Sequence, residues 1–175
     1  MSNVTGPGTA QDRNRLFERL VDQYQEPVLR LCYYCLCDKT QAEDATQETF
    51  LKLYRSLDNY RGGCSEKTWI MKIAARVCYD INHSGWFRLM NRHVTPEMLP
   101  CEAAAEEARN DAELAEAVMK LPFKLREAIL LYYYQGMNVN EIADALNLSH
   151  SSVSGRLKRG REKLKKMLEG RELDE

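Results

Sequence analysis

The chain has 175 residues, of which 44% are hydrophobic and 29% are charged. This composition is that of a globular protein with a packed core, and it excludes an intrinsically disordered chain. The formal net charge at pH 7 is only −1, so the total charge alone does not indicate a nucleic-acid partner.

The charge is divided unevenly along the chain. Residues 12–92 carry a net charge of +2, residues 97–116 carry −6, and residues 117–175 carry +3. Two mildly basic parts therefore flank an acidic middle, an asymmetry that matters for nucleic-acid binding. The longest apolar and aromatic run, residues 128–134, is far too short to span a bilayer. Without a recognisable secretory signal, we expect a cytoplasmic protein with reduced thiols and no direct membrane insertion.

The first part of the chain predicts helices. Residues 1–11 are rich in Gly, Pro and small polar residues and are expected to form a disordered tail. Asp12 is a candidate cap for a first helix, and apolar residues follow it at helical spacing. Pro27 is expected to interrupt this helix, because proline is unfavourable in a helix interior. A second helix would then run from Val28 through Cys35.

Three cysteines, Cys32, Cys35 and Cys37, have a spacing that suggests a metal or redox site. A structural zinc site usually needs a second pair of ligands, however, and the sequence has no second Cys-x-x-Cys. The three lie in an apolar helical run, where cysteine behaves as a small buried side chain. We therefore favour buried thiols, predict no metal or cofactor, and keep a thiol- or zinc-responsive protein as an alternative.

Residues 40–84 predict two more helices. Thr40 and Glu43 form a capping box. The helix that they open has one apolar face, made of Ala45, Thr49, Phe50, Leu53, Tyr54 and Leu57. A second face of the same helix carries Asp44, Gln47, Glu48, Leu51 and Arg55. Ser65 is a candidate cap for the next helix, whose buried face is expected to be Trp69, Ile70, Ile73, Ala74, Val77 and Ile81.

Residues 98–109 are acidic and rich in Ala and Glu, and they read either as a helix or as a flexible tether within an acidic linker, residues 95–110. We place the domain boundary there. The sequence thus predicts an all-α protein of two small helical domains, residues 12–94 and 111–175, which are joined by a flexible acidic linker.

The C-terminal domain contains the pattern of a helix-turn-helix. Asn138 and Glu141 form a capping box, Asn147 tolerates the left-handed turn that follows, and Ser149 can cap a second helix. Short side chains occupy the start of that second helix, and basic residues follow them, which suits contact with DNA. A basic helix end that only complements its own dipole would explain the last lysines, but not the turn and the short side chains together.

Two motif blocks now carry a family resemblance. The first is QAEDATQETFLKLYRSLDNYR with KTWIMKIAARVCYD behind it, and the second is LPFKLREAILLYYYQGMNVNEIADALNLSHSSVSGRLKRGREKL. From Phe17 to Leu168 the chain resembles the extracytoplasmic-function group of bacterial RNA polymerase sigma factors. The resemblance implies a protein without catalysis of its own that binds core polymerase and directs promoter-specific initiation of transcription. In this family an anti-sigma protein commonly holds the activity down.

The resemblance also implies roles for single residues. Docking on core polymerase, through the β′ coiled coil and the β subunit, falls to Asp44, Gln47, Glu48 and Leu51. Recognition and melting of the start-proximal (−10) promoter element fall to Arg76, Tyr79, Asn82, His83, Trp86 and Arg88. Recognition of the upstream (−35) element falls to Ser152, Ser154, Arg156, Lys158 and Arg159. The family often has Ala where Gly160 stands, and glycine costs about 1 kcal/mol in a helix interior.

A second function stays open on the residues alone. A helix-turn-helix regulator that acts as a dimer would use the same C-terminal domain without docking on polymerase. It predicts a palindromic DNA site and a stable dimer when no polymerase is present.

Overall fold

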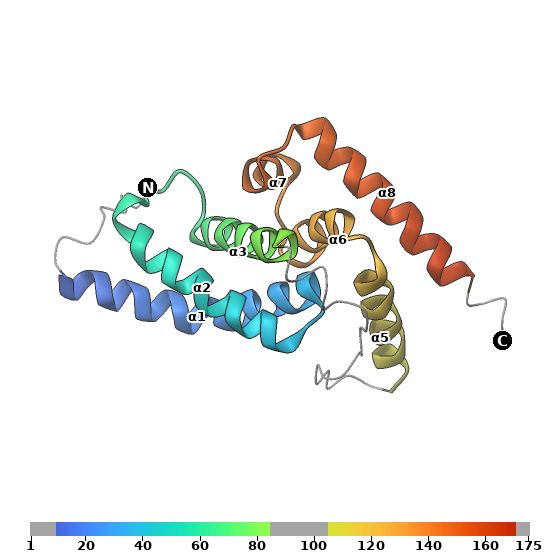
Figure 1. Ribbon diagram of the computed structural model, residues 1–175, viewed down its shortest axis with the longest axis horizontal. Helices are drawn as coiled ribbons and strands as arrows, with labels where there is room; N and C mark the ends of the chain where they lie inside the picture. Colours follow the sequence, from blue (N-terminus) through green and yellow to red (C-terminus); the bar gives the residue numbers. More distant parts are fainter. Residues whose placement is uncertain (1–9, 85–104, 171–175) are drawn as a thin grey trace.

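The computed structural model describes residues 10–84 and 105–170 of the chain, and it shows them as helices joined by short turns, as predicted (Figure 1). The N-terminal half consists of α1 (Ala10–Leu36), α2 (Lys39–Ser56), the 3-10 turn η1 (Leu57–Asn59) and α3 (Glu66–His83). The C-terminal half consists of α5 (Ala105–Lys120), α6 (Phe123–Ile129), the π-helical turn η2 (Leu130–Tyr134), α7 (Val139–Leu146) and α8 (His150–Glu169).

The first helix is longer than the sequence predicted. It starts at Ala10, inside the segment assigned to the tail, and it continues through Pro27 to Leu36. The predicted interruption at Pro27 is therefore wrong. Leu20 before the proline and Leu31 after it are both buried on the same face. Each buried leucine contributes about 1.5–3 kcal/mol, so burial on both sides offsets the roughly 3 kcal/mol that an interior proline costs.

The second helix starts from a different cap than predicted. Asp38, in an extended conformation, accepts a hydrogen bond from the Gln41 backbone N–H at 2.8 Å and so caps α2. Thr40 lies inside the helix instead of preceding it. The chain reaches this cap through Cys37, whose φ of 56° turns it sharply away from α1. Ser65 caps α3 as predicted, accepting from the Thr68 N–H at 3.0 Å.

The helix-turn-helix has the predicted local structure. Asn138 and Glu141 form the reciprocal capping box of α7. Asn147 ends α7 in the left-handed conformation, with φ 53° and ψ 52°. Ser149 then caps α8 by accepting from the Ser152 N–H at 3.2 Å. Val153 is buried and anchors α8 on the core.

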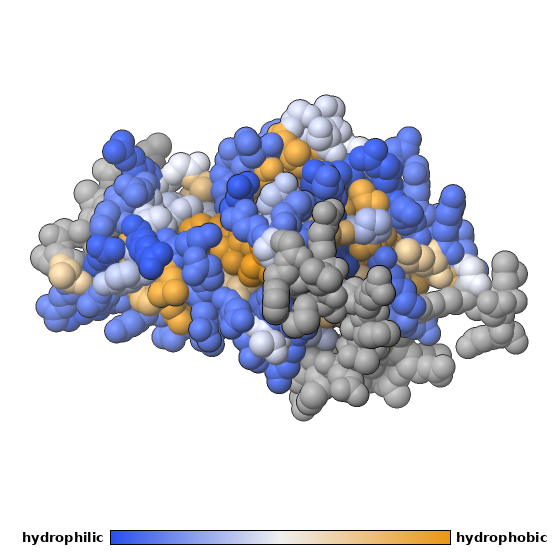
Figure 2. All heavy atoms as spheres, viewed as in Figure 1, coloured by the Kyte–Doolittle hydropathy of each residue, from blue (hydrophilic) through white to orange (hydrophobic). Residues whose placement is uncertain are grey.

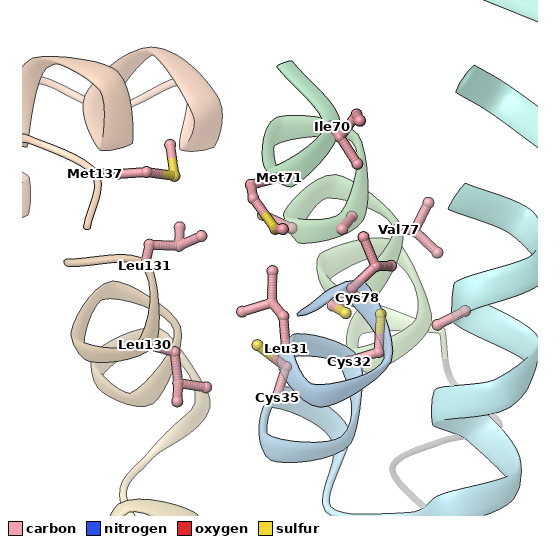
Figure 3. Close-up of a cluster of buried hydrophobic side chains, with 14 of the residues drawn as sticks. Leu31, Cys32, Cys35, Ile70, Met71, Val77, Cys78, Leu130, Leu131 and Met137 are labelled. Atoms are coloured by element: carbon pink, nitrogen blue, oxygen red, sulfur yellow. The ribbon is translucent and has the colours of Figure 1, made fainter. Parts of the chain in front are cut away.

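One continuous core joins the two halves. Figure 3 shows Leu31 and Cys35 of α1, together with Met71 of α3, facing Leu130 and Leu131 of η2. Across the same junction between the halves, α3 packs on α7, and α1 packs on α5, α6 and η2. The halves therefore lie against each other in this structure, a point that the sequence left open.

Polar contacts accompany this packing. The Thr68 hydroxyl of α3 donates to a Glu141 carboxylate oxygen of α7 at 2.9 Å. One turn further along α3, Lys72 forms an ion pair with Asp144 of α7. The capping glutamate of the helix-turn-helix thus serves α7 and the contact between the halves at once.

A buried polar contact between the halves is made by Arg126 of α6. Its buried guanidinium donates to the carbonyls of Met119 and Leu121 in its own half and to the Cys35 carbonyl of α1, the last at 2.7 Å. Hydrogen bonds from a charged donor are the stronger ones. An arginine in the second half therefore caps a carbonyl group in the last turn of α1.

The linker assignment is changed in part. Helix α5 begins at Ala105, so residues 105–110, which we had placed in a flexible linker, are helical. Residues 95–104 lie outside the described residues, as do 1–9 and 85–94. The boundaries 12–94 and 111–175 stay predictions. No helix among the described residues combines the length and apolar character that a membrane span requires.

Cys32 and Cys35 are buried in the core, together with Cys78 of α3. Hydrogen bonds with Cys32 and Cys35 raise the pKa of the Cys78 thiol well above its usual value, and burial acts in the same direction. Cys37 is half-buried, and burial raises the pKa of its thiol. The raised pKa values keep the Cys78 and Cys37 thiols protonated. Cys32 and Cys35 pack as small buried side chains, as the sequence favoured.

Candidate protein and nucleic-acid interfaces

The outer face of α2 presents the residues predicted to dock on polymerase. Asp44, Gln47 and Leu51 are exposed, and Glu48 is partly covered. Leu51 has 52% of its surface exposed, although it is a large apolar residue on a helix whose opposite face is fully buried. Glu48 lies 3.8 Å from Lys52, one turn further along. An exposed leucine framed by polar side chains is the composition expected of a small docking surface.

The last turns of α3 present the described part of the predicted start-proximal site. The Tyr79 and His83 rings stack with centroids 3.8 Å apart, and the Arg76 guanidinium lies over the Tyr79 ring at 5.3 Å. Asn82 is half-buried beside them. Trp86 and Arg88 lie outside the described residues. A stack of two rings and a guanidinium offers planar groups on which an unpaired base can stack.

A chain of ion pairs joins these two surfaces, which the sequence had treated separately. Lys52 of α2 lies 3.8 Å from Glu48 and 4.0 Å from Asp80 of α3, and Asp80 lies 3.2 Å from Arg76. The charges of the α2 face are therefore continuous with those of the α3 site. All four side chains are substantially exposed, so each pair contributes little to stability.

The third predicted surface lies along α8, and Figure 2 shows hydrophilic residues following the outer side of this helix. Ser152, Lys158 and Arg159 are exposed, and Ser154 is half-buried. The Ser152 hydroxyl lies 2.8 Å from the Ser149 hydroxyl, so the capping residue also orients it. The start of α8 is thus open to a partner, while Val153 and Leu157 on its other side are buried.

Arg156 differs from the other predicted reading residues. Only 14% of its side chain is exposed, and its guanidinium lies 3.7 Å from the Glu127 carboxylate of α6. Glu127 is itself only 1% exposed. Burial raises the pKa of Glu127 to about 8, while Arg156 and then Arg126 act in the opposite direction. In this structure Arg156 therefore faces α6 as much as it faces outward.

Gly160 has a packing role that the sequence did not indicate. It is buried at the crossing of α8 and α6. A Cβ atom at this position would lie 2.8 Å from Cγ1 of Ile129 and 3.1 Å from its Cδ1. Because Gly160 has no side chain, α8 can approach α6 closely. The glycine thereby sets the distance between α6 and the helix that carries the predicted DNA-reading residues.

Sequence reasoning missed Lys52, Asp80 and Glu127. Lys52 and Asp80 are ordinary surface charges in the sequence, and only the packing of α2 on α3 brings them together. Glu127 did leave a signal, because it directly precedes an apolar run, residues 128–131, that is buried throughout.

Two family models match this chain. Residues 20–88 match the family model of sigma-70 region 2, and residues 111–164 match that of sigma-70 region 4. The ECF RNA polymerase sigma factor SigX of Bacillus subtilis is 29% identical over 167 residues, and the match covers 87% of this chain and 84% of SigX.

Two solved structures share the fold over most of the chain. CnrH, in complex with the cytosolic domain of CnrY, superposes with a TM-score of 0.66 at 25% identity, and the match covers 90% of each chain. RpoE of Bartonella quintana, in complex with the anti-sigma factor NepR, gives a TM-score of 0.70 at 20% identity, covering 87% of this chain and 96% of RpoE. The region 2 match over the first half favours the function that includes polymerase docking over a dimeric regulator.

Proposed function

Because this chain belongs to the extracytoplasmic-function group of sigma-70 RNA polymerase sigma factors, we propose that it docks on core polymerase through the outer face of α2. In this proposal α3 contacts the start-proximal promoter element and α8 reads the upstream element. The chain acts in the cytoplasm as an initiation factor and carries out no catalysis of its own.

The exposed face of α2 is the observation that carries the docking proposal. Leu51 is half exposed, and Asp44 and Gln47 project beside it, while the opposite face of α2 is packed on α1 and α3. An apolar centre with a polar rim suits the side of a partner helix, and the β′ coiled coil is such a partner. The β subunit completes the contact with core polymerase.

The two DNA surfaces differ in what they offer. The end of α3 has the ring stack of Tyr79 and His83 beside Arg76, which fits unpaired bases in opened DNA. The start of α8 has short serine side chains at a helix N-terminus with Lys158 and Arg159 beyond them, which fits the backbone and base edges of a duplex. Linking the two contacts in one chain allows each to be weak.

Control by an anti-sigma protein is part of the proposal. The solved structure of RpoE contains an anti-sigma factor, and the solved structure of CnrH contains the cytosolic domain of CnrY. A chain with this fold therefore has the form that such partners bind. Binding of a partner over the α2 face would compete directly with docking on polymerase.

Run-off transcription tests the proposed function. Purified core polymerase is incubated with a library of promoters, with and without this protein, and initiated transcripts are sequenced. We expect initiation that depends on the protein and shares two promoter elements. No initiation, together with a stable dimer bound to a palindromic site, would contradict the proposal.

A matched pair of variants tests the docking surface. Glu48→Arg reverses a charge on the α2 face, and Glu18→Arg makes the same change at an exposed position of α1. We expect the first variant to lose affinity for core polymerase and the second to keep it. Both should unfold at temperatures close to that of the unchanged protein, because surface substitutions seldom change stability by more than about 0.5 kcal/mol. Equal affinity of the two variants would remove the docking assignment.

A further inference from the structure

Glu127 of α6 is a buried acid whose carboxyl group lacks hydrogen bonds. Within the part of the chain that the structure describes, no protein group donates to either of its carboxyl oxygens. A buried polar group without such partners is uncommon and calls for a functional explanation. The group that faces it is the Arg156 guanidinium of α8, 3.7 Å from Oε2.

The surroundings leave Arg156 as the cation whose position Glu127 can influence. Two charged groups act on the Glu127 carboxyl, Arg156 from α8 and Arg126 from α6 itself. Among the described residues, the other elements packed on α6, which are α1 and η2, add none. Arg126 is already held by three backbone carbonyls. Among the residues that the structure describes, the partner of the Arg156 guanidinium is the Glu127 carboxylate.

The position of Arg156 in α8 connects this pair to the DNA surface. Arg156 follows Ser152 by one helical turn, so the two side chains project from the same side of the helix. Ser152 is exposed and belongs to the predicted reading surface. A guanidinium that leaves Glu127 therefore emerges beside residues proposed to contact DNA, where a phosphate or a guanine edge would accept its hydrogen bonds.

We propose that Glu127 is a positioning residue for Arg156: its carboxylate form retains the guanidinium on α6, and its protonated form releases it to DNA. This inference rests on the proposed role of α8 in reading the upstream element. The proposal predicts that the contribution of the upstream element to promoter binding falls as the pH rises from 7 to 9, although no group of the duplex DNA titrates in this range.

The expected size follows from the titration of the acid. Burial raises the pKa of Glu127 to about 8, so the protonated fraction is about 0.9 at pH 7 and about 0.1 at pH 9. If only the protonated form releases Arg156, the apparent affinity scales with that fraction. The upstream element should then lose up to about tenfold of its contribution to affinity between pH 7 and pH 9.

Holoenzyme reconstituted from core polymerase and the full chain tests the proposal. Dissociation constants are measured at several pH values from 7 to 9 on the promoter with the strongest run-off signal and on a copy whose upstream element is scrambled. The dissociation constant of the scrambled promoter divided by that of the intact promoter isolates the upstream element, because any pH dependence of the polymerase affects both duplexes. The comparison covers the unchanged chain, Glu127→Gln, Arg156→Ala and the double variant.

We expect the ratio to fall with pH for the unchanged chain only. Glu127→Gln, which mimics the neutral acid, should keep the pH 7 ratio throughout, and Arg156→Ala should give a flat, lower ratio with either residue at position 127. A purely structural role of Glu127 would shift the ratio equally at every pH. Parallel profiles for the unchanged chain and Glu127→Gln, or a slope that survives Arg156→Ala, would overturn the proposal.

The two levels of inference fail in different ways. If no promoter responds to the protein, the proposed function is wrong and this inference falls with it. If the holoenzyme binds and the upstream element matters, but the ratio does not change with pH, only the role of Glu127 is wrong. Arg156→Ala provides an independent reading, since it must flatten the profile even if Glu127→Gln does not fold.

Discussion

Replacing Gly160 by alanine tests how closely α8 and α6 approach each other. A Cβ atom at position 160 would lie 2.8 Å from Cγ1 and 3.1 Å from Cδ1 of Ile129. Ile129 is buried and cannot swing into solvent. Adding a methyl group to a well-packed site costs about 1–3 kcal/mol, whereas exchanging glycine for alanine inside a helix gains about 1 kcal/mol. The net effect is a loss of about 0–2 kcal/mol.

The same helix offers a matched control. A Cβ atom at Gly155 would meet nothing closer than an Arg159 side-chain nitrogen at 3.9 Å. Gly155→Ala should therefore gain the helix term without the clash, a stabilisation of about 1 kcal/mol. The two variants share the substitution and the helix, so the difference between them is the packing cost alone, about 1–3 kcal/mol.

Thermal and urea unfolding of the two variants measure this difference. For a chain of this size, 1 kcal/mol corresponds to about 2–4 °C in Tm. Gly160→Ala should unfold below Gly155→Ala, and Ile129→Ala should reduce the gap, because neighbouring sites couple. Equal unfolding temperatures for the two glycine variants would show that α6 and α8 are not in contact at Gly160.

Three further predictions concern stability and thiols. The pKa of Glu127 is about 8 in the folded chain, raised from 4.5. Its stabilising contribution is therefore complete below about pH 4.5 and is lost as the pH rises to about 8. Between these pH values, urea unfolding should show the free energy of unfolding of the unchanged chain falling by up to about 1.4 kcal/mol per pH unit relative to Glu127→Gln. Asn147 has a left-handed conformation, so Asn147→Gly should leave the unfolding temperature nearly unchanged, while Asn147→Val should lower the free energy of unfolding by about 1–2 kcal/mol. Cys64 is half-buried and Cys32 is buried, so mass spectrometry after brief thiol labelling should find Cys64 modified well before Cys32, and equal labelling would contradict the burial.

Local signals predicted the helix-turn-helix correctly. Asn138, Glu141, Asn147 and Ser149 act within a few residues of themselves, so their roles are readable from side-chain chemistry and spacing. The same reasoning failed at Pro27. A proline in a helix is a local cost, but the benefit that outweighs it comes from the packing of α2 and α3 on α1.

Among the candidate surfaces, too, the features set by local sequence could be predicted, and the features set by packing between helices could not. The exposed face of α2 could be predicted, because the buried and exposed positions alternate with the helical period. The pairing of Arg156 with Glu127 could not, since it depends on how α8 crosses α6. Nor could the role of Gly160, because a glycine in a helical pattern reads as a weakness until the neighbour that it accommodates is known.

Arg126 bears on how easily the halves can come apart. If the C-terminal half moves away, the guanidinium keeps its bonds to the Met119 and Leu121 carbonyls and loses only the one to Cys35. The Cys35 carbonyl belongs to the last turn of α1, where water can replace the lost donor. At Arg126 the polar cost of separation is therefore that of one charge-assisted bond, about 1.5–3 kcal/mol, and it adds to the loss of the Thr68–Glu141 and Lys72–Asp144 contacts. A partner such as polymerase can therefore break the Arg126–Cys35 bond reversibly, because neither half is left with a buried charge that has no hydrogen-bond partner.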